Sequence, residues 1–171
     1  ECGGVRVHLA DTPGYPDFAG QAIGALAAVD TALVVVNAQT GIELSTERMM
    51  KWAGERGLCR MIVINKIDCD NLDLPKLGGE LRERFGKACM LLDLPAHDRH
   101  DVVEVLDHDA GDADFESVAA AHRALIDQID TIATTTNFNG VALLNGSAAS
   151  VSIQTGVNAS DTVSVGLSDS R

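Results

Sequence analysis

The sequence Met61-Ile62-Val63-Ile64-Asn65-Lys66-Ile67-Asp68 joins a short apolar run to a polar loop, and it decides the fold class. Apolar residues at every position from 61 to 64 are typical of a strand buried in a parallel sheet. A similar run covers residues 32–36. Between the two runs we expect a helix, because Ser45 is a good N-cap and Gly57 is placed to end it. Strand, helix and strand in this order predict a parallel pair, since such strands need a crossover connection.

The same alternation of strands and helices continues on both sides of this unit. Towards the N-terminus, alternating apolar residues predict a strand over residues 5–9, and residues 18–29 fit a helix. Towards the C-terminus, we expect a helix over residues 74–85 and a strand over residues 89–92. The whole pattern predicts an α/β fold with a parallel sheet and helices on both faces.

Two polar loops follow predicted strands. Asp11-Thr12-Pro13-Gly14 comes after the strand at residues 5–9, and Asn65 begins the loop after the strand at residues 61–64. In open parallel sheets, ligands bind beyond the carboxyl ends of the strands. We therefore expect both loops to contribute to one site.

The first loop resembles the DxxG loop of P-loop GTPases. The carboxylate of Asp11 would hold Mg²⁺ through water, because this hard cation prefers oxygen ligands and keeps several waters. Gly14 would offer its backbone N–H to the γ-phosphate of GTP, and no side chain there would obstruct the approach.

The second loop has the NKxD pattern of a guanine-binding loop. The carboxylate of Asp68 can accept both the N1–H and the exocyclic amine of guanine, an arrangement that adenine cannot satisfy. Asn65 would steady the loop and the purine edge, and the stem of Lys66 would lie over the base. These four residues alone could also form an ordinary strand-end turn. Their place after a DxxG loop favours the nucleotide interpretation.

Residues 4–125 resemble the GTPase domain of elongation factor G, and especially that of the elongation factor G-like proteins. The resemblance implies a Ras-like P-loop GTPase fold that binds GTP or GDP with Mg²⁺. It also implies the ribosome as partner and a location in the bacterial cytoplasm. The residues that carry it are Val7-His8-Leu9-Ala10-Asp11-Thr12-Pro13-Gly14-Tyr15-Pro16-Asp17-Phe18, Val34-Val35-Val36-Asn37-Ala38-Gln39-Thr40-Gly41, Ile62-Val63-Ile64-Asn65-Lys66-Ile67-Asp68 and Ala113-Asp114-Phe115 through Leu125.

Three features depart from the pattern of that family. The 171 residues contain no GxxxxGK[ST] sequence, so we expect a truncated domain that lacks the phosphate loop and switch I. Tyr15 stands at the position of the family's catalytic His, which orients the attacking water. Residues 141–148 imitate the family's final Ser-Ala nucleotide loop only superficially. The resemblance thus implies a GTPase, whereas the departures predict that this chain is inactive alone.

The composition changes near residue 130. Residues 131–171 contain only Asp161, Asp169 and Arg171 as charged residues. Residues 126–165 resemble flagellin, in which such a sequence forms the end of a long helix, a turn and a β-hairpin. The residues that carry this resemblance are Ile126-Asp127-Gln128-Ile129-Asp130-Thr131-Ile132-Ala133, Thr136-Asn137-Phe138-Asn139-Gly140-Val141, Leu143-Leu144-Asn145-Gly146-Ser147 and Gln154-Thr155-Gly156-Val157-Asn158-Ala159-Ser160-Asp161-Thr162-Val163-Ser164-Val165.

Two resemblances in one chain predict a chimera. Residues 1–125 would form the truncated GTPase domain, and residues 126–171 a flagellin-like helix, turn and β-hairpin. The join would lie inside one continuous helix over residues 115–132. The alternative to a nucleotide-binding translation factor is a non-enzymatic structural or interaction segment, with self-association of the flagellin type.

Bulk properties exclude several classes of function. The net charge of −12 argues against wholesale binding to nucleic acid or to anionic membranes. No apolar run approaches the roughly 20 residues of a membrane span, and the four cysteines form no CxxC pair. His97, His100 and His108 lie among aspartates. A solvated acidic loop is favoured over a metal site there, because the spacing does not fit a calcium loop.

Overall fold

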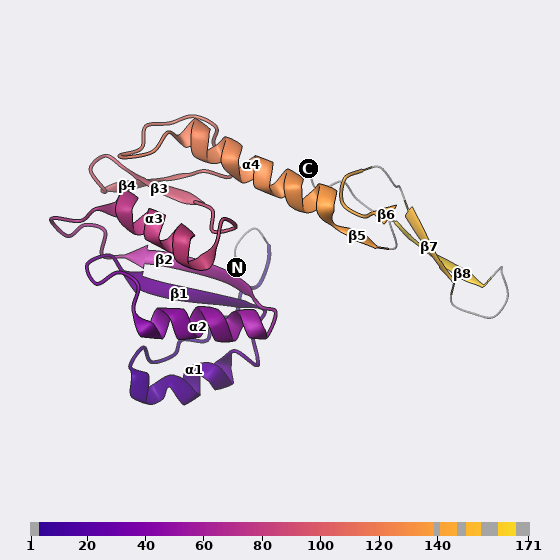
Figure 1. The fold of residues 1–171 in the computed structure, drawn as a ribbon, viewed down its shortest axis with the longest axis horizontal. Coiled ribbons are helices and arrows are strands. Elements are labelled where there is room, and N and C mark those ends of the chain that lie inside the picture. Colours follow the sequence, from indigo (N-terminus) through magenta and orange to yellow (C-terminus); the bar gives the residue numbers. More distant parts are fainter. Residues whose placement is uncertain (1–3, 139–140, 147–149, 155–160, 167–171) are drawn as a thin grey trace. The chain divides into compact units, whose positions relative to one another are not determined.

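The structure is a computed structural model that describes residues 4–138, 141–146, 150–154 and 161–166 (Figure 1). The chain forms two compact units, Glu1–Leu81 and Arg82–Arg171. In the described part of the chain, no helix is long and apolar enough to cross a membrane.

The first unit is built on a pair of parallel strands. Strand β1 (Thr31–Asn37) pairs with β2 (Cys59–Asn65) in a register that runs from Thr31↔Cys59 to Asn37↔Asn65. Helix α2 (Leu44–Glu55) makes the crossover and lies along the sheet (Figure 1). The predicted strands at residues 32–36 and 61–64, their parallel pairing and the connecting helix are therefore confirmed.

Helix α2 covers one face of this sheet. Ala32 of β1 and Ala53 of α2 are buried together with Leu26, and Trp52 and Leu58 pack against them. The opposite face carries four apolar side chains that are between 40% and 57% exposed: Leu33, Val35, Met61 and Val63. The expectation that both strands are buried throughout is therefore wrong for that face.

The ends of the helices differ in part from the prediction. Helix α3 (Leu74–Phe85) has the predicted bounds. Helix α2 starts two residues earlier than expected, so that Glu43 rather than Ser45 is its N-cap, without a side-chain cap bond. Gly57 follows this helix with a φ of 69°, as expected of a residue that ends it. The helix predicted over residues 18–29 is shorter, with a 3₁₀ turn (Pro16–Phe18) before α1 (Ala19–Ala25).

Two predicted strands of the parallel sheet are absent from the described residues. Residues 5–9 belong to none of the strands, and their apolar side chains are exposed, up to 91% for Leu9. A strand needs a hydrogen-bonding neighbour, and in the described residues β1 and β2 pair only with each other. Residues 89–92 are also not a strand. The next strand, β3 (Asp93–Ala96), pairs antiparallel with β4 (Asp101–Glu104) instead of joining the parallel sheet.

The second unit packs this β3–β4 hairpin against helix α4 (Val118–Thr135). Leu94, Val105 and Val118 are at most 1% exposed. Ala121 and Leu125 complete the buried cluster, because a spacing of three and four residues places them on the same helix face as Val118. The predicted continuous helix is confirmed, although it begins and ends three residues later than expected.

Four short strands follow α4. Strand β5 (Asn137–Phe138) pairs antiparallel with β6 (Val141–Ala142), and β7 (Ser150–Gln154) with β8 (Thr162–Gly166). The β-hairpin expected within residues 126–171 is thus confirmed for its strands. Residues 139–140 between β5 and β6 and residues 155–160 between β7 and β8 lie outside the described residues, as do residues 147–148 of the Ser-Ala imitation.

Candidate functional site

The loop after β2 begins at Asn65, and the side chain of Asn65 accepts a hydrogen bond from the loop's own backbone. The backbone N–H of Lys66 donates a hydrogen bond to Oδ1 of Asn65 at 2.8 Å. Lys66 has a φ of 60°, a left-handed conformation that a non-glycine residue adopts only where its surroundings hold it. The N–H of Cys69 reaches the Lys66 carbonyl oxygen at 3.4 Å and closes the turn. The side chain of Asp68 is exposed within this turn, so its carboxylate is accessible to a ligand.

The loop after β1 lies beside the loop after β2. The backbone N–H of Ala38 donates to the carbonyl oxygen of Asn65 at 2.9 Å, which extends the strand pairing by one bond beyond Asn37. Two hydrogen bonds to Asn37 close the loop that follows β1. Its Oδ1 accepts the N–H of Gln39 at 3.0 Å, and its carbonyl oxygen accepts the N–H of Gly41 at 2.9 Å. The carboxyl ends of both strands thus form one connected set of loops.

Sequence reasoning missed the role of Asn37 in this set. In the sequence, Asn37 stands out only as the boundary between an apolar run and the polar loop after it. The parallel register supplies the signal that could have found it, because the last residue of each strand is an Asn and the two are paired.

The loop at residues 11–14 follows no strand among the described residues, and Asp11, Pro13 and Gly14 are exposed. Nothing in the described residues lies within 4 Å of the position that a Cβ on Gly14 would take, so its backbone is open to a ligand. Tyr15 is 76% exposed, and its carbonyl oxygen accepts the N–H of Phe18 at 3.0 Å. Among the described residues, no hydrogen bond or ion pair joins Asp11 to residues 65–68. That the two loops form one site therefore stays a prediction.

The acidic segment between β3 and α4 has a structural role at one position. The carboxylate of Asp114 accepts backbone N–H groups from Asp98 and Arg99. Among the described residues, no group of three or more His, Cys, Asp or Glu side chains could hold a metal ion.

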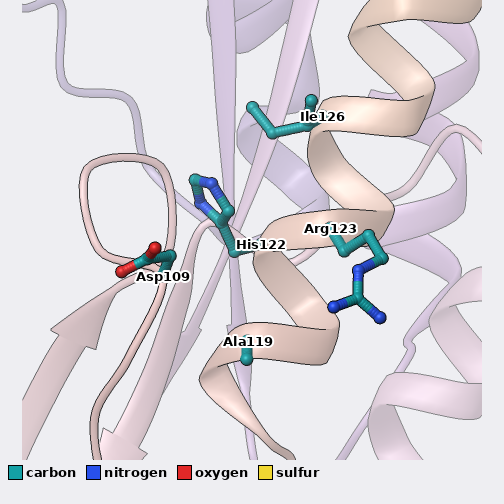
Figure 2. Close-up of a pocket in the computed structure, with 5 residues that line it drawn as sticks. All are labelled: Asp109, Ala119, His122, Arg123 and Ile126. Atoms are coloured by element: carbon teal, nitrogen blue, oxygen red, sulfur yellow. The ribbon is translucent and has the colours of Figure 1, made fainter.

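A shallow cavity of about 280 Å³ lies beside α4 (Figure 2). Its lining residues are Asp109, Ala119, His122, Arg123 and Ile126. Nδ1 of His122 lies 2.7 Å from the carbonyl oxygen of Val105, a buried residue of the core. Figure 2 shows the guanidinium of Arg123 pointing away from the imidazole of His122. The cavity therefore does not bring the imidazole of His122 and the guanidinium of Arg123 together.

Comparisons with known proteins identify the relatives of the chain. The family model described as "Elongation factor Tu GTP binding domain" matches residues 2–163. The chain is 38% identical over 80 residues to Elongation factor 4 of Aster yellows witches'-broom phytoplasma, an alignment that covers 47% of this chain and 13% of that protein. It is 34% identical over 95 residues to an Elongation factor G-like protein of Mycobacterium tuberculosis, which covers 56% of this chain and 13% of that protein.

A solved structure from Thermus thermophilus has a similar fold. The two chains share a TM-score of 0.58 and 30% sequence identity, over 74% of this chain and 21% of the other. The present chain therefore spans only a small part of the length of each of these proteins. The family match continues to residue 163 and so includes most of the segment that resembles flagellin. The flagellin resemblance stays a prediction.

Proposed function

The chain belongs to the family of elongation factor Tu GTP-binding domains, and we propose that it supplies the guanine-binding and magnesium-binding loops of a translation factor. Its α/β fold is that of a partial Ras-like GTPase domain. The observation that carries the proposal is the loop after β2, in which the Lys66–Asn65 hydrogen bond holds the turn and leaves the Asp68 carboxylate exposed.

Asp68 is the residue that would select the base. Its two carboxylate oxygens accept the N1–H and the exocyclic amine of guanine, and hydrogen bonds to an ionised acceptor are about twice as strong as neutral ones. Adenine presents an acceptor at N1 and no amine at C2, so it leaves one carboxylate oxygen unpaired and places a lone pair against the other. Asn65 holds the loop, and the alkyl stem of Lys66 covers the face of the base.

Asp11 and Gly14 would serve the phosphate end of the nucleotide. The donor set fits Mg²⁺, because a carboxylate together with phosphate oxygens and waters is its usual environment. When bound, Mg²⁺ would neutralise part of the negative charge of the phosphate oxygens. The open space above Gly14 fits a phosphate oxygen against the backbone N–H.

Hydrolysis of GTP is not part of the activity proposed for this chain alone. The phenol of Tyr15 has no basic nitrogen with which to orient a water as an imidazole does. The 171-residue sequence also contains no GxxxxGK[ST] phosphate loop. Contacts to the base would therefore supply most of the affinity for the nucleotide. Weak, guanine-selective binding is the expected behaviour. In the complete translation factor, the ribosome in the cytoplasm would be the partner.

Isothermal titration of the 171-residue chain with GDP and with ADP, each with Mg²⁺, tests this function. GDP is expected to bind and ADP to give no heat. Asp68→Ala should weaken GDP by about tenfold or more, because a hydrogen bond to a charged group contributes about 1.5–3 kcal/mol. Asp70→Ala removes an exposed carboxylate two residues further along and is the matched control. Equal binding of GDP and ADP would overturn the proposal.

A second proposal concerns the tail, in which two apolar side chains of β8 are exposed. Val163 is 52% and Val165 44% exposed, on a hairpin whose sequence resembles flagellin. We propose that this hairpin self-associates. Light scattering at rising protein concentration should then show an increasing mass that Val163→Asp abolishes. Ser164→Asp, on the adjacent position of the strand, adds the same charge on the other face and should leave association intact. A constant monomer mass would exclude the proposal.

A further inference from the structure

We propose that Asn37 is a positioning residue for the guanine loop at residues 65–68, an inference that rests on the proposed function. Asn37 would not touch the nucleotide. It acts through Ala38 on Asn65, which in turn holds Lys66 and the turn that presents Asp68.

Two hydrogen bonds hold Asn65 in place, one from each side. Its side-chain Oδ1 accepts the N–H of Lys66 at 2.8 Å, and its carbonyl oxygen accepts the N–H of Ala38 at 2.9 Å. The first bond lies within the guanine loop itself. The second is the point at which the loop after β1 supports it. The peptide plane between Asn65 and Lys66 is thereby fixed from outside the loop.

Asn37 determines where the N–H of Ala38 points. Its Oδ1 accepts the N–H of Gln39 at 3.0 Å, and its carbonyl oxygen accepts that of Gly41 at 2.9 Å. These bonds lie on both sides of Ala38 and give residues 37–41 one defined conformation. Such side-chain bonds to the next residues of the chain are the usual way in which an Asn fixes a turn.

The turn at residues 37–41 also lies close to α3, the helix that follows the guanine loop. A Cβ on Gly41 would lie 3.7 Å from Cδ1 of Leu77, so the backbone of the turn is close to α3. Leu77 is 6% exposed, and Asp73, the residue before α3, accepts the N–H of Lys76 at 2.9 Å with its Oδ1. Residues 37–41 therefore hold the segment by a hydrogen bond at Asn65 and lie close to it again at Leu77.

Guanine selection depends on this anchoring because a bidentate contact is sensitive to geometry. Hydrogen bonds weaken steeply when the donor angle departs from linearity. A carboxylate held at the correct angle gains a second bond from the 2-amine of guanine. A carboxylate on a loose loop keeps the bond to N1–H and loses part of the second. Loosening the turn should therefore lower discrimination between guanine and hypoxanthine, which lacks the 2-amine.

The test compares GMP and IMP in NMR titrations of the full 171-residue chain. Asn37→Ala should weaken GMP by about fivefold, the effect of one hydrogen bond, and weaken IMP less. Asn37→Asp keeps an acceptor for the N–H of Gln39 and should restore the GMP to IMP ratio. Gln39→Ala keeps the backbone N–H that Asn37 binds and is the control that should change nothing. Equal losses for GMP and IMP in Asn37→Ala would overturn the inference, since a merely structural effect lowers both alike.

Amide hydrogen exchange of the nucleotide-free chain separates this inference from the proposed function. Asn37→Ala should accelerate exchange of the Lys66 and Ala38 amides and leave that of Val36, within β1, unchanged. If the wild-type chain does not distinguish GMP from AMP, the proposed function fails. If the Lys66 amide keeps its protection in Asn37→Ala, the positioning role fails, whatever the chain binds.

Discussion

The carboxylate of Asp114 accepts a hydrogen bond from the backbone N–H of Arg99 at 2.7 Å. Its other oxygen accepts the N–H of Asp98 at 3.0 Å. Both donors belong to a run of three residues, His97 to Arg99, with φ between 53° and 67°. Consecutive left-handed residues other than glycine are strained and persist only where other contacts hold them. We infer that Asp114 stabilises the turn that joins β3 to β4.

Asp114→Ala should lower the free energy of unfolding by about 1–2 kcal/mol, because two charge-assisted hydrogen bonds to a strained turn are lost at an exposed site. Urea denaturation measures the change. Asp112→Ala removes another exposed carboxylate from the same segment and should stay within about 0.5 kcal/mol of the wild type. Equal stabilities for the two variants would contradict this role of Asp114.

Two helical glycines should respond differently to substitution by Ala. Gly79 of α3 has open space where a Cβ would lie, so Gly79→Ala should stabilise the fold by about 0.5–1 kcal/mol through helix propensity. At Gly54 of α2, a Cβ would lie 2.9 Å from Nη1 of Arg60, which donates to the carbonyl oxygen of Met50 at 3.3 Å.

The Arg60 side chain must move in Gly54→Ala, and the loss of its hydrogen bond offsets the gain in propensity. We expect a net change close to zero. Thermal unfolding of the two variants measures the difference, and a Gly54→Ala variant as stable as Gly79→Ala would show that Arg60 contributes nothing there.

The sequence predicted the elements whose partners are close along the chain. The strands at residues 32–36 and 61–64 have each other as neighbours and α2 as cover, so the local pattern contained what their pairing required. Residues 5–9 have the same kind of apolar pattern and belong to none of the sheets of the described residues. The apolar pattern of residues 5–9 could not indicate the missing sheet partner. Periodicity shows which face of a strand is apolar, but it does not show which strand pairs with the backbone.

Hydrogen bonds to the backbone were the part of the candidate site that the sequence did not predict. The types and spacing of Asn65, Lys66 and Asp68 indicated the chemistry of the loop. The support from Asn37 depends on a parallel register that is fixed only when the strands pair. The role of Asp114 could not be predicted either, because composition does not distinguish a carboxylate that binds two N–H groups from the aspartates near it.

Cys89 should react more slowly with alkylating agents than the exposed Cys59. Burial raises the pKa of the Cys89 thiol above its ordinary value, and the nearby positive charge of Arg82 lowers it in part. Because the thiolate is the nucleophile, a raised pKa leaves less of the reactive form at mildly alkaline pH. Peptide mass spectrometry after iodoacetamide treatment measures both sites. Arg82→Gln should slow Cys89 further, whereas Lys87→Gln should not; a faster reaction in Arg82→Gln would contradict the assignment of the charge.

The raised pKa of Cys89 also gives the pH dependence of stability a definite sign. The unfolded thiol loses its proton at a lower pH than the folded one. The contribution to stability is therefore fully present below the ordinary thiol pKa and is lost as the pH rises through the folded value. Cys89→Ser should reduce this alkaline loss in urea denaturation series, and an identical pH profile in the variant would contradict the linkage.

Asp68→Asn should change the base that the loop prefers. The carboxylate presents two acceptors, which match the N1–H and 2-amine of guanine. An amide presents one acceptor and one donor, which match the N1–H and 2-oxo group of xanthine. GMP should therefore bind about tenfold more weakly to the variant, and XMP more tightly than to the wild type. NMR titrations with GMP, XMP and AMP measure the three affinities. Asp70→Asn, in the same exposed segment, should leave the preference for GMP intact. A gain for XMP would assign the base contact to residue 68, because weaker folding or looser packing would reduce the affinity for every nucleotide. A variant that keeps the wild-type preference for GMP would show that Asp68 does not read the base.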